Sequence, residues 1–217
     1  MSVALESVYM SDMSSDVDHT GKGVTCLDGQ QDRDFVERAQ TGDVEAFEEL
    51  VRRYRNDVFA LACHFVRNRD DAWDISQEVF IKTHRSLRRF RGDASFKTWL
   101  MRITANQCKD FLKRRRLKTV ALEQDGAFQQ PASRAPGPGS AAEAREIGDA
   151  IEKTLESIPF KHRTAFVLRE LEGLSYEEMA QVMGCSLGTV MSRLHHARRK
   201  LRKGLSRMGH SRSVDHA

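Results

Sequence analysis

Apolar residues recur every three or four positions along much of the chain, which is the period of amphipathic helices. The longest run of this kind follows Asp43, a residue type that often caps helices. Its inward positions are Phe47, Leu50, Val51, Tyr54, Val58, Leu61, Ala62 and Phe65. A shorter helix is expected before it, over residues 34–40, ended by Thr41 and Gly42. No segment shows the two-residue alternation of a half-buried strand, so the sequence predicts an all-α fold.

Two more helices are predicted between Asp71 and Arg116. The first has an inward stripe formed by Ala72, Ile75, Val79 and Thr83. Trp73 and Phe80 fall well off this stripe when the helix is projected at about 100° per residue. We therefore expect a second apolar face on this helix, free to bind a partner.

The second of these helices follows a turn at Gly92 and Asp93, and Ser95 is its expected N-cap. Its inward residues are Phe96, Trp99, Leu100, Ile103, Phe111 and Leu112. Many cations surround it, namely Arg85, Arg88, Arg89, Arg91, Lys97, Arg102, Lys109 and Lys113 to Arg116. Aromatic side chains among so many cations suit a nucleic-acid strand with unstacked bases.

The C-terminal part of the chain predicts another set of helices. One is expected over residues 141–157, and the next begins after Pro159, which suits a first helical turn. Gly173 ends it. Ser175 and Glu178 have the spacing of a capping box, so a short helix should follow and stop at Gly184.

A longer basic helix begins at Ser186, and together with the short helix and its turn it predicts a helix-turn-helix. Its inward side is formed by Val190, Leu194, Ala197 and Leu201. The other side carries small, hydroxyl and cationic residues, which suit base edges and phosphates. These candidate DNA-binding residues are Ser186, Gly188, Thr189, Ser192, Arg193, His195, His196, Arg199 and Lys203.

Composition divides the chain into five segments. Residues 1–31 are rich in Ser, Asp and Gly and are expected to be a disordered acidic extension. Residues 117–142 hold three of the four prolines and are expected to be a flexible linker. Two small helical domains are thus predicted, at residues 32–116 and 143–207, with a tail at 208–217.

The net charge of +4 hides a strong segregation of charge along the chain. Residues 186–212 contain eight Lys or Arg and no acid, which points to a polyanionic partner. No apolar run approaches the roughly twenty residues of a spanning helix, and the N-terminus lacks the order of a signal peptide. A cytoplasmic location is therefore expected.

Candidate catalytic and metal-binding residues are sparse. The four cysteines, Cys26, Cys63, Cys108 and Cys185, lie far apart and form no metal-binding pair. The sequence contains no Gly-rich phosphate loop and no recognisable Ser/His/Asp constellation. We therefore expect neither an enzyme nor a metal or other cofactor.

The segment D-A-W-D-I-S-Q-E-V-F, followed by F-R-G-D-A-S-F-K-T-W-L-M-R-I-T-A-N-Q-C-K-D, resembles region 2 of the bacterial sigma-70 factors. The likeness is to their extracytoplasmic-function (ECF) group and spans about forty residues. It implies that the first helix binds RNA polymerase core through Asp71, Asp74, Gln77, Glu78 and Phe80. It also implies that the second helix and its preceding loop bind the melted −10 promoter element. The residues implied there are Phe90, Phe96, Arg102, Asn106, Lys109, Lys113, Arg114 and Arg115.

The C-terminal part, from residue 147 to 205, resembles region 4 of the same family, with G-T-V-M-S-R-L-H-H-A-R as its densest match. This resemblance implies recognition of the −35 element by the last helix, and regulation by an anti-sigma protein. The family usually carries a cation where this chain has Met191, and Arg where it has His196. The alternative is a stand-alone helix-turn-helix regulator with an N-terminal ligand-binding or dimerisation domain. Such a regulator would not need a helix suited to single-stranded DNA.

Overall fold

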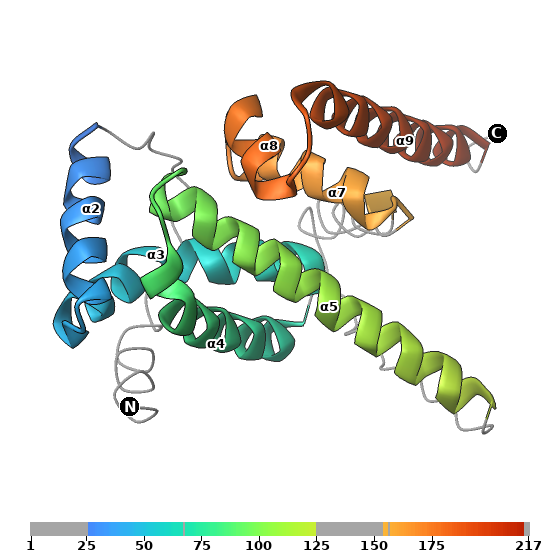
Figure 1. The fold of residues 1–217 in the computed structure, drawn as a ribbon. Helices are drawn as coiled ribbons and strands as arrows, with labels where there is room; N and C mark the ends of the chain where they lie inside the picture. The colour runs from blue at the N-terminus through green and yellow to red at the C-terminus, as the bar shows by residue number, and fades with distance from the viewer. Residues whose placement is uncertain (1–25, 67, 125–153, 156, 215–217) are drawn as a thin grey trace, which may run out of the picture. The chain divides into compact units, whose positions relative to one another are not determined.

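The computed structural model describes residues 26–66, 68–124, 154, 155 and 157–214, and these ranges contain helices and turns but no strand (Figure 1). The chain divides into two compact units, Met1–Lys113 and Arg114–Ala217. The predictions of an all-α fold and of two helical domains are confirmed.

The first unit is built from helices α2 (Cys26–Gln40), α3 (Val44–Val66) and α4 (Arg69–Ser86), with the 3-10 turn η1 (Leu87–Arg89) and helix α5 (Phe96–Gln124). Helix α3 is central to the unit because α2 packs against it on one side and α4 on another. All eight predicted inward residues of α3 are buried. From α5, the core receives Phe96, Leu100, Met101, Ala105 and Cys108.

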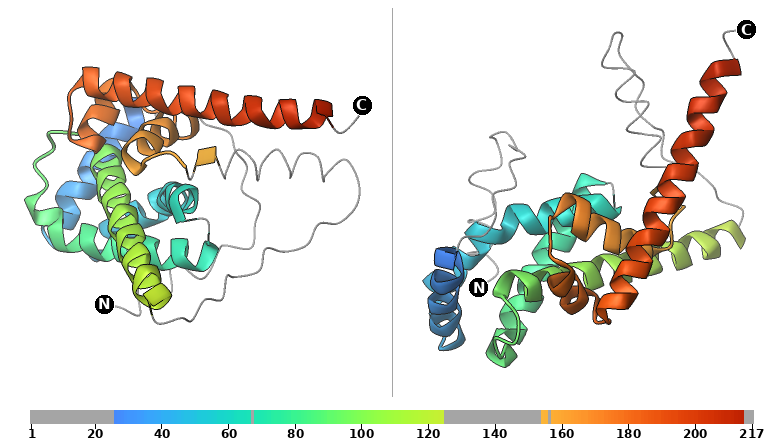
Figure 2. Two further views of the ribbon diagram at one scale, coloured as in Figure 1. Left: turned by 90° about the vertical axis from the view of Figure 1, so that its right-hand side faces the viewer. Right: turned by 90° about the horizontal axis from the view of Figure 1, so that it is seen from above.

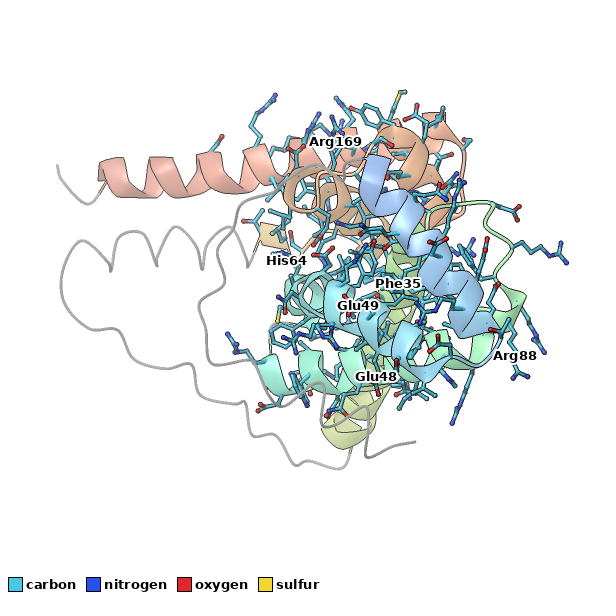
Figure 3. The ribbon with its side chains drawn as sticks, turned by 90° about the vertical axis from the view of Figure 1, so that its left-hand side faces the viewer. Phe35, Glu48, Glu49, His64, Arg88 and Arg169 are labelled. Carbon is cyan, nitrogen blue, oxygen red and sulfur yellow. The ribbon has the colours of Figure 1, made fainter. Side chains whose placement is uncertain are left out.

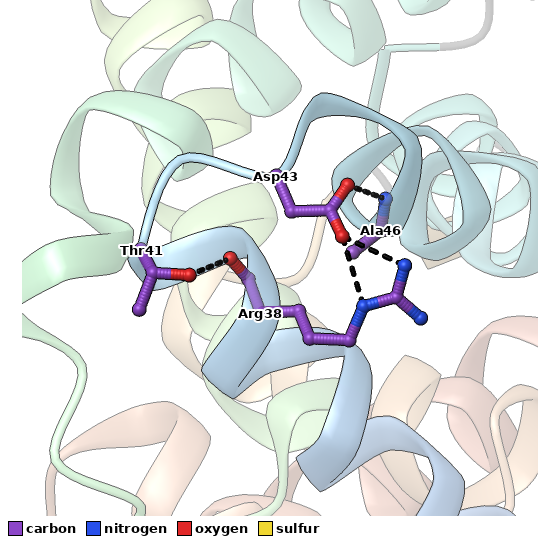
Figure 4. A network of polar contacts seen from close by, with 4 residues as sticks. All are labelled: Arg38, Thr41, Asp43 and Ala46. Carbon is purple, nitrogen blue, oxygen red and sulfur yellow. Dashed lines mark hydrogen bonds and ion pairs between the residues drawn. The ribbon is translucent and has the colours of Figure 1, made fainter.

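Local capping residues set where these helices begin. The Asp43 carboxylate accepts a hydrogen bond from the Ala46 amide at 3.1 Å and one from Arg38 at 2.8 Å (Figure 4). Both bonds lower the pKa of Asp43 below its ordinary value, and the bond from the Ala46 amide has the larger effect. Ser95 caps α5 as predicted, because its hydroxyl accepts from the Thr98 amide at 3.1 Å.

The second unit contains α7 (Phe160–Phe166), a π-helical segment η2 (Val167–Leu171), α8 (Tyr176–Met183) and α9 (Leu187–Val214), which runs as one long helix (Figure 2). The predicted capping box is present, since Ser175 and Glu178 bond each other's amides at 2.8 and 3.2 Å. Gly184 ends α8 with φ at +57°, a conformation that favours glycine. The core of this unit is Ala165, Val167, Leu168, Leu174, Met179, Val182, Val190, Leu194, Ala197 and Leu201.

Several predicted boundaries need correction. Helix α2 begins at Cys26, within the predicted extension, and not near residue 34. Helix α5 continues to Gln124, so residues 117–124 are not extended linker. Helix α9 continues to Val214, into the predicted tail. Three predictions fall on residues that the structure does not describe. They are the disorder expected for residues 1–25, the rest of the flexible linker, and most of the helix expected over residues 141–157.

Candidate nucleic-acid and polymerase interfaces

The outer side of α4 carries the first group of candidate contacts. Asp74 and Glu78 are exposed there, and Gln77 and Asp71 are partly exposed. Glu78 lies 3.9 Å from Lys82 in a solvent-exposed pair one turn along the helix. Four acidic or amide groups thus lie on a helix whose other side is built into the core.

Phe80 does not belong to this outer surface, so its predicted role as an exposed anchor is wrong. Its side chain is only 2% exposed, and the ring is part of the core of the first unit. The buried residues of α4 cover an arc of about 140° around the helix, which is wider than the predicted inward stripe. The arc is wide because two helices contact α4: α3 packs against it, and Gln107 of α5 is hydrogen-bonded to its Lys82. Trp73 is partly exposed and lies edge-on to Phe59, with the ring centroids 6.4 Å apart. Of the predicted second apolar face, Phe80 is therefore covered by the chain itself, whereas Trp73 stays partly exposed and Ile81 is 39% exposed.

An aromatic cluster supports the loop that enters α5. Phe90 lies 4.8 Å from Trp99, and Phe96 lies within 6.2 Å of both rings. Phe96 is 4% exposed, so its ring lies in the core and supports the loop, and its contact with DNA stays a prediction. Phe90 and Trp99 remain partly exposed. Gln40 fixes the same loop by donating hydrogen bonds to the carbonyls of Leu87 and Phe90 at 2.9 and 2.8 Å.

The exposed side of α5 carries a polar stripe. Arg102, Asn106, Lys109 and Lys113 are all exposed and follow one another at three- or four-residue steps. They consequently fall within about 60° of one another around the helix. Arg114 and Arg115 follow Lys113 along the chain and are also exposed, but they point to other sides of α5. Arg88, in the turn after α4, projects outward from the same unit (Figure 3).

A shallow cleft of about 360 Å³ lies between α4 and α5 beside this stripe. Asn106 is at its edge, and the buried Gln107 is held there by the ammonium group of Lys82. The lining combines two cations, two amides, a hydroxyl, a carboxylate and one apolar side chain: Lys82, Arg85, Ser86, Ile103, Asn106, Gln107 and Asp110. The sequence indicated Asn106 as a DNA-binding residue but did not indicate Lys82 or Gln107. Whether these two side chains meet at the cleft depends on how α4 and α5 pack together.

The helix-turn-helix presents the second group of candidate contacts. Ser186, Gly188 and Ser192 are exposed near the start of α9, and His195, Arg199 and Lys203 are exposed further along. Thr189 and Arg193 are partly exposed, and Arg193 donates to the sulfur of Cys185 at 3.5 Å. Small groups thus lie where the helix can approach DNA closely, and cations follow them, as predicted from the sequence.

His196 differs from the other candidate residues of α9 because it turns toward α7. Its ring stacks on His162 with the ring centroids 5.4 Å apart and an angle of 29° between the planes. Partial burial, followed by the charges of His196 and Arg193, lowers the pKa of His162 below its ordinary value. Sequence reasoning missed His162, because no local pattern indicates a contact with a residue 34 positions away.

Nothing in the described ranges indicates a metal centre or a membrane span. No group of three or more His, Cys, Asp or Glu side chains there could hold a metal ion. No described helix is long and apolar enough to cross a membrane. Cys63 has a thiol whose pKa is raised by burial, which disfavours the reactive thiolate.

Comparison with known proteins identifies both units. Residues 50–118 match the family Sigma-70 region 2, and residues 148–201 match the family Sigma-70, region 4. The RNA polymerase sigma-H factor of Pseudomonas aeruginosa is 40% identical over 185 residues, with 82% of this chain and 96% of the relative covered. The ECF RNA polymerase sigma-E factor of Escherichia coli K12 is 40% identical over 177 residues, with 77% and 90% covered.

Solved structures give the same result. CnrH in complex with the cytosolic domain of CnrY has a TM-score of 0.62 at 27% identity, covering 81% of this chain and 97% of that one. The sigma factor RpoE of Bartonella quintana, in complex with the anti-sigma factor NepR, has a TM-score of 0.58 at 25% identity, covering 75% and 98%. The two helical units, their order along the chain and these likenesses together show that the chain belongs to the ECF group of the sigma-70 family of RNA polymerase sigma factors.

Proposed function

We propose that this sigma factor uses three separate surfaces to bring RNA polymerase core to its promoters, namely the outer side of α4, the polar stripe of α5 and the DNA-facing side of α9. The main support for this proposal is that α5 and α9, one in each helical unit, both expose a cationic surface and bury their opposite side. Sigma factors are non-enzymatic regulators of initiation, so the polymerase performs the chemistry. The protein would act in the cytoplasm, where its polymerase and promoters are.

The outer side of α4 is the proposed docking surface for polymerase core. Asp71, Asp74 and Glu78 offer carboxylates to basic groups, and the Gln77 amide offers both a donor and an acceptor. Phe80 contributes by shaping the helix from inside and not by direct contact, because its ring is buried.

The polar stripe of α5 is the proposed surface for the melted −10 element. Arg102, Lys109 and Lys113, with the neighbouring Arg114 and Arg115, would neutralise phosphates along a single strand. Asn106, at the edge of the cleft, would bond the edge of an unstacked base. Phe90 offers a partly exposed ring in the loop, and the buried Phe96 supports it.

The DNA-facing side of α9 is the proposed reader of the −35 element in the major groove. Ser186, Gly188, Thr189 and Ser192 would approach base edges at the start of the helix. Arg193, His195, His196, Arg199 and Lys203 would position the helix on the phosphates. The alternative of a stand-alone regulator is not favoured, since the first unit matches a sigma region and not a ligand-binding or dimerisation domain.

We also propose that an anti-sigma protein binds this chain. Two related structures, CnrH with CnrY and RpoE with the anti-sigma factor NepR, contain such complexes or partner domains. A partner that covers α4 and the DNA-binding helices together would block both core and promoter binding.

The decisive experiment is transcription in vitro with purified core polymerase, followed by mapping of the transcripts that require this chain. The proposal predicts new start sites that share two upstream elements. Glu78→Lys should lower core affinity, and Arg199→Ala should leave core affinity unchanged while weakening promoter binding. A chain that bound promoter DNA equally well with and without core would contradict the proposal.

A further inference from the structure

A compact group of titratable residues lies where α7 meets α9. His162 of α7 and His196 of α9 stack with ring centroids 5.4 Å apart. The Arg199 guanidinium lies 3.2 Å from Nδ1 of His196, and since arginine can only donate, this nitrogen is the acceptor. The ring of His196 therefore receives a hydrogen bond there and carries no proton on that nitrogen.

The charges around this pair are cationic on both helices. Lys161 acts on His162 from α7, and Arg193, His196 and Lys200 act on it from α9. His195 lies edge-on to His196 with centroids 6.1 Å apart. Partial burial, followed by these charges, therefore disfavours the charged form of His162 while the surface is free.

Two carboxylates of the neighbouring elements are engaged elsewhere. Glu170 of η2 accepts from Arg198 at 3.0 Å, and Arg198 lies on the opposite flank of α9 from His196. Glu178 of α8 is bound to the amide of Ser175 in the capping box. A surface with this many cations around the histidine pair is suited to an anion supplied by a partner.

We propose that His162 and His196 form a phosphate-binding site for the DNA backbone, and that the site takes up a proton at His162 when the phosphate binds. The proposal rests on the function proposed above, in which α9 binds the −35 element, and it extends that interface onto α7. A phosphodiester beside the two rings places negative charge near His162 and favours its charged form. His162 gains one proton from solvent and donates it in a hydrogen bond to a phosphate oxygen, which stays ionised. His196, whose Nδ1 accepts from Arg199, donates its existing Nε2 proton to the same phosphate and takes up none.

The expected consequence is a promoter affinity that rises as pH falls. Linkage makes the binding constant change by up to about tenfold per pH unit for each proton taken up. We expect the dissociation constant of the holoenzyme for a −35-containing promoter to fall at least about tenfold between pH 7.5 and 6.0. An arginine at position 196 would place a permanent cation beside His162, disfavour its protonation and flatten the dependence.

The test compares holoenzymes made with the full chain and with three variants on a promoter mapped by the transcription experiment. His162→Gln combined with His196→Gln should lose most of the pH dependence, and His196→Arg should reduce it while retaining tight binding. His84→Gln is the matched control, because this histidine belongs to α4 of the first unit and is not part of the proposed −35 interface. Thermal unfolding of each variant shows whether the fold is kept, and the single His162→Gln variant serves if the double variant is unstable.

Titration calorimetry in two buffers of different ionisation enthalpy counts the protons taken up by each holoenzyme. Duplexes that carry one neutral methylphosphonate linkage, scanned across the −35 region, locate the phosphate. Loss of proton uptake at one linkage would support the site. Equal pH slopes for the wild type and the double glutamine variant, or no effect of any single linkage, would overturn it. Absence of −35-dependent binding at every pH would instead contradict the proposed function.

Discussion

Met191 is an exposed apolar side chain on α9, next to the polar residues of the DNA-facing side. It is 52% exposed, and Leu187, one turn earlier on the same flank of α9, is 40% exposed. The thymine methyl is the apolar group that base pairs present in the major groove, so we expect Met191 to contact one. Replacing that thymine by deoxyuridine should weaken binding about fourfold, the equivalent of about 0.8 kcal/mol for one buried methyl-sized group.

The control is the same base change measured with Met191→Ala. Filter binding or fluorescence anisotropy of the holoenzyme on both duplexes gives the double-mutant cycle. If the side chain reads the methyl, deoxyuridine should cost the variant much less than it costs the wild type. An equal loss in both proteins at every thymine of the element would contradict the assignment.

Phe80 gives a prediction about stability and not about binding. Because the ring is 2% exposed, Phe80→Ala should lower the free energy of unfolding of the first unit by about 3–5 kcal/mol. Ile81→Ala is the matched control, since that side chain is 39% exposed and lies next along α4. Both tryptophans, Trp73 and Trp99, lie in the first unit, so their fluorescence during urea unfolding reports this unit. A Phe80→Ala protein as stable as Ile81→Ala would contradict the burial.

These residues show which features a sequence can predict. The caps at Asp43, Ser95 and Ser175 were predictable, because each depends on a residue three positions away. The burial of Phe80 was not, since it depends on how α3 and α5 cover α4. The stacking of His162 on His196 could not be predicted either, because it joins two helices that are distant along the chain.

At the scale of elements, α5 combines a buried side with a polar stripe, and Asn106 is the residue that tests its proposed role. Asn106→Ala should leave core binding unchanged, because the side chain belongs to the polar stripe of α5 and not to the proposed docking surface on α4. It should reduce strand opening at promoters, since an amide that bonds an unstacked base is lost. Permanganate footprinting of open complexes measures this. Lys109→Ala is the comparison, as it should weaken binding more uniformly across sequences and lower the salt dependence.

The ends of the elements were predicted less well than their existence. Residues 117–124 read Leu-Lys-Thr-Val-Ala-Leu-Glu-Gln, in which good helix formers predominate, and α5 continues through them. The first proline of the expected linker is Pro131, so the proline-rich composition describes only the later part of the segment and not its helical residues 117–124. The π-helical segment η2 was also missed, since residues 160–171 have the pattern of one regular helix.

At the scale of the whole molecule, the exposed surfaces for core and DNA raise the question of what keeps them inactive. The N-terminal residues 1–25 carry a small excess of acids, with Glu6, Asp12, Asp16 and Asp18 against Lys22. Exposed charges are screened beyond about 8 Å at physiological salt, and an exposed ion pair contributes about 0–1 kcal/mol. This segment therefore offers weak attraction to the basic helices, whereas a separate anti-sigma protein could cover a large surface.

Deleting residues 1–25 tests this argument while keeping α2 whole. The deletion should end before Cys26, because Asp32 of α2 accepts a hydrogen bond from Arg53 at 2.7 Å and is buried against α3. We expect transcription with purified core to change by less than about fivefold, the equivalent of about 1 kcal/mol. Deleting residues 1–40 is the control for damage to the fold, since it also removes the Gln40 bonds that hold the loop before α5. A much larger rise after removal of residues 1–25 alone would assign the inhibitory role to the N-terminal segment, because no anti-sigma protein is present in that assay.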